Sequence, residues 1–453
     1  MKGSSKVTVV RGGTIWSGVP RQAPVVADLV IEDGIIAAIE PDFTGGADLE
    51  LDATSALVLP GLFNSHLHPG GSPLIRGIAE DMELPPNGAF FHNTAAVLGL
   101  GRTELSLEEY QSLIEWDCVA MLAGGATTLT VELLGVGYEQ IWIDLVGRLG
   151  FRCNLGLTYP HNIIKPTPEE AAAGLRDGIA LADEHNGKFG DRLRVQLSPH
   201  GPDTVTDEVL RETRRTATER GLNVHLHLAQ HMGEVKTVQD RSGGLGPVAY
   251  LERMGFLGHD VVATHGTYIE SGDIARLASS RATIVYCGYR KAKEALMTPF
   301  TEYLEGGVNV VLGTDTFSHN MIEDMKFGAI LGKIRHGRIS RPTALDMVTC
   351  ATVNAARAMR RDDLGQLVPG HRGDVTIISL AGPFNTPAAE PIKSLVYYST
   401  ASDVRHTLVD GQPVVLDGKV CNIDASDIQR RATAAVTRLW ELAQDKGVLA
   451  PTW

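Results

Sequence analysis

Cysteine is scarce in this sequence and follows no motif. The 453 residues include 5 cysteines, and none of them forms a C-x-x-C pair. This scatter favours neither a disulfide framework nor a thiolate metal site. We therefore expect reduced thiols, most of them buried.

Long apolar runs and an excess of basic charge are also missing. No stretch of about 18 apolar residues occurs, and residues 1–18 lack the apolar core of a secretory signal. The formal net charge is -13, whereas binding to nucleic acid or to an anionic membrane depends on clustered Lys and Arg. These absences predict a cytoplasmic protein that binds a small-molecule substrate, with no nucleic acid and no membrane as partner.

The most informative stretch runs from Leu59 to His68. Its last five residues, Asn-Ser-His-Leu-His, place His66 and His68 two positions apart. Residues two apart on a strand point to the same face, so both imidazoles face one way. A structural role would require partners for two buried ring N–H groups, whereas one divalent metal ion accepts both lone pairs. The pair therefore predicts a metal site.

Both ends of the chain carry short runs of β-branched residues separated by turns. Near the start these runs are 6–10, 28–31 and 34–39, and near the end they are 374–379, 404–409 and 414–415. Neither set can bury its apolar face alone. We expect one small β-sandwich domain built from residues 1–60 and 362–422.

Between the two ends, apolar runs alternate with longer stretches of helix-forming composition. The expected strands are Gly61–His68, Ala126–Glu132, Arg152–Tyr159, Leu193–Pro199, Asn223–Ala229, Val261–His265, Thr283–Cys287 and Val308–Asp315. Eight such units predict an α/β fold, a (β/α)8 TIM-type barrel over residues 61–361. Residues 423–453 include an amphipathic segment, which we expect to pack as a helix on the outside.

Side chains that bind metal recur at the carboxyl ends of the expected strands, where barrels of this type collect their chemistry. His66 and His68 end strand one, His227 lies near the end of strand five, His265 ends strand six and Asp315 ends strand eight. Taken singly, His265 could be a core histidine and Asp315 a helix cap. Together they predict one metal centre.

These motifs resemble those of the amidohydrolase superfamily, and the likeness covers nearly the whole chain. The segments that carry it are Pro60-Gly61-Leu62-x-Asn64-x-His66-x-His68, His227, His265 and Gly313-Thr314-Asp315. Leu74-Ile75-Arg76-Gly77 and Pro199-His200-Gly201-Pro202 further resemble the branch that holds cytosine deaminase-like, adenosylhomocysteine deaminase-like and triazine hydrolase-like enzymes.

The resemblance implies a metal-dependent hydrolase with His200 near the substrate. The implied ligands of one divalent ion per chain, Zn²⁺ or Fe²⁺, are His66, His68, His227, His265 and Asp315. We also expect a homo-oligomer.

Two further residues bear on the metal count and on the choice of ligand. His225 shares a face with His227, but His227 matches the family position and lies nearer the strand end, so His225 would pack one layer deeper. Relatives with two metals usually hold them with a carboxylated lysine on strand three or four. Neither expected strand contains a lysine, so we expect a mononuclear site, with Lys165 just past strand three as the residue to check.

The chain departs from its deaminase-like relatives at two places. Where they carry a glutamate that shuttles a proton to a ring nitrogen, this chain has Gln230, and an amide cannot do acid–base work. Glu234 lies four residues further on, and we expect it to be part of a helix on the surface. The segment after strand seven, residues 286–291, also differs from the family pattern, which indicates a rebuilt pocket wall.

The favoured reaction is therefore hydrolysis of an amide, urea or carbamate-type C–N bond in a small apolar molecule. It resembles the reactions of enzymes that hydrolyse phenylureas and thiocarbamates. Metal-activated water would attack, Asp315 would carry the proton to the leaving nitrogen, and Gln230 would donate a hydrogen bond to the carbonyl oxygen. The expected substrate contacts are His200, Gln230, Arg76, Phe91, His92 and Tyr286.

Two alternatives stay open. One is an aminohydrolase (deaminase) or dechlorinase that acts on a triazine, pyrimidine or purine-like ring, with another group in place of the missing glutamate. The other is a catalytically silent binding protein on the same fold, since a fold does not fix a function. Retention of all five candidate ligands argues against the silent protein.

Overall fold

The computed structural model describes residues 6–78, 80, 81, 90–135, 137–163 and 165–449, without the side chains of residues 90–93. Its centre is a barrel of parallel strands. They are β6 (Leu62–Leu67), β7 (Ala126–Leu133), β8 (Arg152–Tyr159), β9 (Leu193–Val195), β10 (Ser198–Pro199), β11 (Val224–Leu228), β12 (Val261–His265), β13 (Thr283–Tyr286) and β14 (Asn309–Leu312). Each expected barrel strand is present, and the fourth is split into β9 and β10 at residues 196 and 197.

Backbone contacts join two arcs of strands into a closed barrel. The N–H of Asp315 donates to the carbonyl of His66 at 3.0 Å, which connects β14 to β6. The N–H of His225 donates to the carbonyl of Leu197 at 2.9 Å, which connects the fourth and fifth strands. Because helices cover the outer face, strands such as β7, β8 and β11 are buried on both faces along their whole length.

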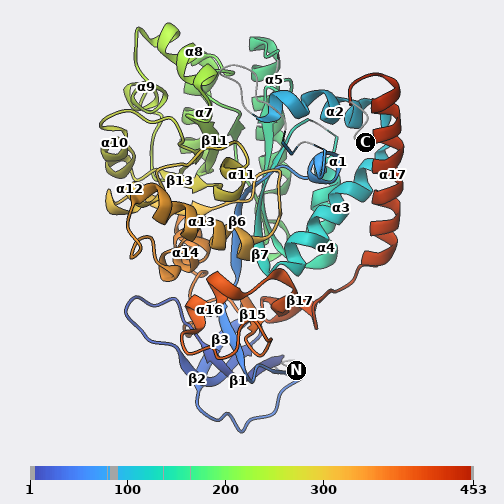
Figure 1. The fold of residues 1–453 in the computed structure, drawn as a ribbon, viewed down its shortest axis with the longest axis vertical. Coiled ribbons are helices and arrows are strands. Elements are labelled where there is room, and N and C mark those ends of the chain that lie inside the picture. Colours follow the sequence, from blue (N-terminus) through green and yellow to red (C-terminus); the bar gives the residue numbers. More distant parts are fainter. Residues whose placement is uncertain (1–5, 79, 82–89, 136, 164, 450–453) are drawn as a thin grey trace.

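Helices follow the barrel strands and surround them (Figure 1). They are α1 (Ser72–Ile75), α2 (Phe90–Glu104), α3 (Leu107–Ala123), α4 (Glu139–Leu149), α5 (Pro168–His185), α6 (Lys188–Asp191), α7 (Asp207–Arg220), α8 (Met232–Ser242), α9 (Pro247–Arg253), α10 (Asp273–Ser280), α11 (Gly288–Ala292), α12 (Phe300–Glu305), α13 (Met321–His336), α14 (Ala344–Ala351) and α15 (Val353–Ala358). Local sequence sets their ends. In α7, Thr206 caps the N-terminus through its hydroxyl, and Gly221 closes the C-terminus with a left-handed φ of 65°.

The two chain ends form one nine-stranded sheet beneath the barrel (Figure 1). Its strands are β1 (Val7–Ile15), β2 (Val25–Glu32), β3 (Ile35–Glu40), β4 (Leu49–Asp52), β5 (Ala56–Pro60), β15 (Val375–Ser379), β16 (Val404–Val409), β17 (Gln412–Leu416) and β18 (Lys419–Val420). The link between the ends is the antiparallel pair β5–β15, in which Val58 lies opposite Ile377. Apolar side chains from both ends pack into a core of their own.

The C-terminal part adds α16 (Pro391–Tyr398), a short 3-10 turn (Ala401–Asp403) and α17 (Ala425–Asp445). Helix α17 runs along the outside of α3 (Figure 1), where the indole N–H of Trp440 donates to the carbonyl of Leu74 at 2.7 Å. No helix in the described part of the chain has both the length and the hydropathy needed to cross a membrane.

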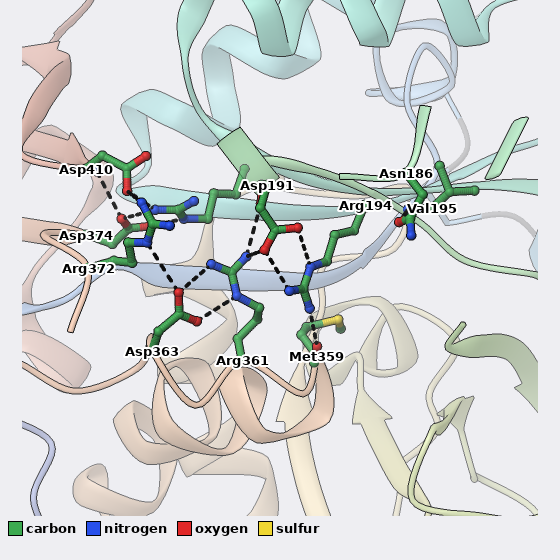
Figure 2. A network of polar contacts seen from close by, with 11 residues as sticks. Asn186, Asp191, Arg194, Val195, Met359, Arg361, Asp363, Arg372, Asp374 and Asp410 are labelled. Carbon is green, nitrogen blue, oxygen red and sulfur yellow. Dashed lines mark hydrogen bonds and ion pairs between the residues drawn. The ribbon is translucent and has the colours of Figure 1, made fainter. Parts of the chain in front are cut away.

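A network of ion pairs joins the barrel to the sheet (Figure 2). Arg152 of β8, which is 2% exposed, donates to both oxygens of Asp374 at 2.7 and 2.8 Å and also contacts Asp410. Arg372 bridges Asp410 to Asp363, at 3.3 Å from each carboxylate. The chain of alternating charges continues from Asp363 through Arg361 to Asp191 and Arg194. It therefore couples the amino ends of β8 and β9 to the C-terminal half of the sheet.

Candidate active site

A cavity of about 440 Å³ opens at the carboxyl ends of the barrel strands. Three of the five expected metal ligands, His68, His227 and Asp315, line it, and so does His200, which was expected near the substrate. Apolar side chains, including Leu98, Ile163 and Phe317, form much of the remaining wall. This volume is in the range of small-molecule sites.

The strongest indication of a metal ion comes from two histidines. The Nε2 atoms of His68 and His227 lie 3.2 Å apart. Each ring donates its Nδ1–H to a backbone carbonyl at 3.0 Å, His68 to Glu132 and His227 to His200, so both Nε2 atoms carry lone pairs. Two lone pairs at this distance repel unless a cation lies between them. Two nitrogens each about 2.1 Å from one tetrahedral ion are roughly 3.4 Å apart.

The remaining expected ligands surround the same point. His66 Nε2 and both ring nitrogens of His265 are buried without a hydrogen-bond partner among the described residues. His265 Nε2 lies 3.6 Å from Asp315 Oδ2. Burial lowers the pKa of each metal-site histidine, which keeps the rings neutral and able to bind metal. The five side chains that the sequence predicted as ligands are thus brought together, and the cluster fits one divalent ion.

Backbone geometry at the strand ends fixes the directions of these side chains. Ala229, His265 and Asp315 have left-handed φ values of 48°, 85° and 57°, a conformation that non-glycine residues rarely adopt. Gly313 allows β14 to approach β6 closely, since a Cβ there would lie 2.9 Å from the backbone nitrogen of His66. The strained backbone conformations thus occur at the strand ends, where the chain turns the candidate ligands toward the metal site.

Glu132, at the end of β7, is a member of the cluster that the sequence analysis missed. Its Oε2 lies 3.7 Å from Nδ1 of His66 and 3.8 Å from Nδ1 of His227. Burial raises the pKa of Glu132 to about 8. Its position at the end of an expected strand was a usable signal, because the same rule identified the other members.

Two of the expected substrate contacts do line the cavity. His200 lies directly after β10, and its ring centre is 4.6 Å from that of His227. Burial lowers the pKa of His200 to about 3, so it is a neutral hydrogen-bonding group. Gln230 follows β11 and is 4% exposed.

The other expected contacts do not line this cavity or have side chains outside the described part of the chain. Arg76 is exposed on the turn after α1, and its guanidinium donates to Ser72 at 3.0 Å. Tyr286 points into the core, where its ring packs 4.6 Å from that of Phe300, because β13 buries this face of its last residue. Phe91 and His92 lie in the first turn of α2, and their side chains lie outside the described part of the chain. Lys165 is exposed and does not line the cavity.

The rebuilt wall after strand seven is the short helix α11, which places two positively charged side chains in the interior of the protein. Arg290 lines the cavity, and its Nε lies 3.2 Å from Asp315 Oδ2. Lys291 donates to Glu294 at 2.8 Å and to the backbone carbonyl of Gln230 at 3.2 Å. The expected rebuilding is therefore present, but Arg290 rather than Tyr286 reaches the site.

Glu234 is not the surface residue that its place on α8 suggested. It is 2% exposed, and its carboxylate accepts the backbone N–H groups of Ala229 and Gln230 at 2.6 and 2.7 Å. The first turn of α8 points this side chain back toward the end of β11, so that it closes the turn that presents Gln230. Burial raises the pKa of Glu234 to about 8.

Two relatives with known names match this chain along nearly their whole length. A 5-methylthioadenosine/S-adenosylhomocysteine deaminase from Haloarcula marismortui is 32% identical over 426 residues, which cover 92% of this chain and 95% of the relative. A 5'-deoxyadenosine deaminase from Methanothermobacter thermautotrophicus is 30% identical over 434 residues, with coverages of 91% and 94%.

Solved structures show the same fold at lower identity. An adenosine deaminase from Xanthomonas campestris with bound zinc superposes with a TM-score of 0.85 at 21% identity, covering 96% of this chain and 98% of its own. An atrazine chlorohydrolase from Arthrobacter aurescens TC1 complexed with zinc gives 0.82 at 20% identity, with coverages of 95% and 100%.

The family model described as "Amidohydrolase family" matches residues 57–414, which include the whole barrel and every candidate ligand. The match agrees with the resemblance carried by the sequence motifs. The chain is thus a hydrolytic enzyme for carbon–nitrogen bonds other than peptide bonds, and it belongs to the amidohydrolase family.

Proposed function

We propose that this enzyme removes the amino group from the purine ring of an adenosine-type compound modified at the 5′ position. The observation that carries the proposal is the match to two deaminases of such compounds at 30% identity or more over at least 91% of this chain. It favours the aminohydrolase alternative of the sequence analysis over hydrolysis of a carbonyl compound.

The candidate ligands are His66, His68, His227, His265 and Asp315. A divalent ion held by them would supply a nucleophilic water, because the ion would lower the pKa of that water to near ~7. Asp315 Oδ1 accepts hydrogen bonds from the backbone N–H and the hydroxyl of Thr316, at 2.7 and 2.9 Å. Its Oδ2 would take a proton from that water and return it to the leaving nitrogen, and the second proton of the water would end on the ring nitrogen.

The cavity wall orients the substrate. His200, held by a 3.1 Å contact between its Nδ1 and the hydroxyl of Thr204, faces the substrate as a neutral hydrogen-bonding group. Leu98 and Phe317 contribute apolar surface for a flat ring. Gln230 binds the ring edge through its amide.

Gln230 also supports a second candidate function. An amide cannot protonate a ring nitrogen, but the Gln230 amide and the Arg290 guanidinium can both donate to a carbonyl oxygen. Hydrolysis of an amide, urea or carbamate-type C–N bond, as in phenylureas and thiocarbamates, needs such donors and no ring protonation.

One substrate panel separates the two candidates. The metal-loaded protein is offered 5′-methylthioadenosine, S-adenosylhomocysteine and adenosine, and ammonia is measured; it is then offered phenylureas, anilides and thiocarbamates, and amine is measured. We expect ammonia from the adenosine-type compounds. Amine release without ammonia release would assign the second candidate, and release of neither would reject both.

Gln230→Glu sharpens this test, with Gln230→Ala as the matched control. If the enzyme is a deaminase, a carboxylic acid at this position adds a proton donor and should raise ammonia release, whereas Gln230→Ala should lower it. A carbonyl hydrolase should lose activity in both variants, by on the order of 10²–10³ for one lost donor.

A further inference from the structure

We propose that His225 is a positioning residue for the metal centre: it holds the ring of His66 so that the lone pair on Nε2 faces the ion, and Gln196 in turn orients His225. The proposal depends on metal binding by the cluster and not on the identity of the substrate. From the sequence alone, His225 is expected only to pack one layer deeper than His227.

The two histidines are in direct contact. Nδ1 of His66 lies 3.2 Å from Nε2 of His225, and both side chains are fully buried. His66 Nε2, on the opposite side of its ring, has no hydrogen-bond partner among the described residues. The ring of His66 therefore contacts His225 through Nδ1, and its Nε2 faces the cluster of candidate ligands.

The position of one hydrogen follows from this contact. Two ring nitrogens at 3.2 Å need one hydrogen between them, because two lone pairs or two N–H groups would repel. His66 binds metal through Nε2 only if its hydrogen is on Nδ1. His66 Nδ1 is then the donor and His225 Nε2 the acceptor. The hydroxyl of Thr264, 2.7 Å from the same Nε2, also acts as a donor to it.

Gln196 completes the arrangement. With Nε2 as an acceptor, the hydrogen of His225 lies on Nδ1, and the atom 3.3 Å from this Nδ1 is Nε2 of Gln196. Two N–H groups facing each other would repel, so the amide of Gln196 must be turned by 180°, which places its oxygen next to the ring as the acceptor; the nitrogen and oxygen of an amide are assigned only from their hydrogen bonds. Gln196 is 2% exposed and lies between β9 and β10. The side chain that contacts His225 therefore comes from the break in the fourth barrel strand.

His66 differs in this respect from two other candidate ligands. His68 and His227 donate their Nδ1–H groups to backbone carbonyls, which no substitution removes. His66 depends on a side chain. Loss of a group that orients a metal ligand typically weakens metal binding by about 10–100-fold, so the dependence is measurable.

The test compares metal affinity in the full-length protein by competition with a chelator, using Zn²⁺ and Co²⁺. We expect His225→Phe, which keeps a ring but offers no acceptor, to weaken binding by about 10–100-fold and to change the Co²⁺ absorption spectrum. His225→Gln places an amide oxygen near the former Nε2 and should retain most of the affinity. His406→Phe is the matched control, because His406 is a buried histidine of β16, away from the cluster.

Substitutions of Gln196 provide an independent readout. Gln196→Leu should weaken metal binding, and Gln196→Glu, which keeps an acceptor for the Nδ1–H of His225, should restore it. The proposal is overturned if His225→Phe folds and binds both ions as tightly as the unmodified protein. If that variant does not fold, equal affinities in Gln196→Leu and Gln196→Glu would overturn it. Because no substrate is used, failure of the substrate panel leaves this outcome unaffected.

Discussion

Removal of the Arg152 guanidinium should destabilise the whole chain, and Arg152→Met is the direct test. Arg152 is buried and donates two hydrogen bonds to Asp374, whose side chain is also buried. Without Arg152, the carboxylate of Asp374 retains the backbone N–H of Asp410, at 3.1 Å, as its one hydrogen-bond donor among the described residues. Asp410 itself keeps Arg372 at 3.3 Å. The variant therefore leaves mainly one uncompensated buried carboxylate.

The expected cost is about 3–5 kcal/mol, the usual consequence of removing one partner from a buried ion pair. The assay is urea unfolding followed by both circular dichroism and tryptophan fluorescence, to check that the two transitions coincide. Arg215→Met is the matched control. Arg215 pairs with Glu212 and Glu219 on the exposed face of α7, where water screens the charges, so its loss should cost far less than the loss of Arg152.

A double substitution tests the reason for the loss. Arg152→Met combined with Asp374→Asn removes the unpaired charge, so it should be at least about 1 kcal/mol more stable than Arg152→Met alone. The reasoning would be refuted if the double variant were no more stable than the single one, or if Arg152→Met cost no more than the Arg215 control.

Three further outcomes are expected. The hydrogen bond from Arg361 holds the pKa of Asp363 well below its ordinary value of 3.8. Asp363 therefore stabilises the fold above about pH 4, and this contribution is lost as the pH falls toward the lowered pKa. The difference in unfolding free energy between Asp363→Asn and the unmodified protein, measured by urea unfolding, should shrink on acidification. Gly313→Ala should weaken metal binding and lower stability by about 1–3 kcal/mol, because the new Cβ would meet the backbone nitrogen of His66 at 2.9 Å; a variant with unchanged chelator competition contradicts this. His200→Asn should retain the metal, measured by elemental analysis, while turnover falls by about 10²-fold; loss of the metal would make His200 a ligand.

The sequence predicted the barrel well because two regular patterns reinforce each other. Apolar runs marked strands buried on both faces, and metal-binding side chains recurred at their carboxyl ends, as with His265 at the end of β12 and Asp315 shortly after β14. Strand alternation also placed His66 and His68 on one face. These signals depend only on the spacing of nearby residues, which can be read from a single sequence.

The residues that the sequence did not reveal are placed by the directions in which the chain turns after each strand, and the spacing of residues along the sequence does not give these directions. After β13 the chain turns at once into α11, and this turn, rather than strand alternation, places Arg290 in the cavity and leaves Tyr286 in the core. Glu234 looks like an ordinary first-turn acid of α8, yet the helix begins so close to β11 that its carboxylate caps the strand end. Gln196 could be identified as an orienting group only after the break between β9 and β10 was known.

The pairing of β5 with β15 has a consequence for how the chain is made. Strand β5 is complete once residue 60 has been synthesised, and the barrel strands follow through residue 312, but the partner of β5 is β15, residues 375–379. During translation, one edge of a wholly apolar strand stays unpaired while the barrel above it is already able to close. Unpaired apolar edges recruit other chains. Nascent chains on neighbouring ribosomes should therefore be most prone to aggregation in the interval before residue 379 emerges, and truncation before β15 should give insoluble protein.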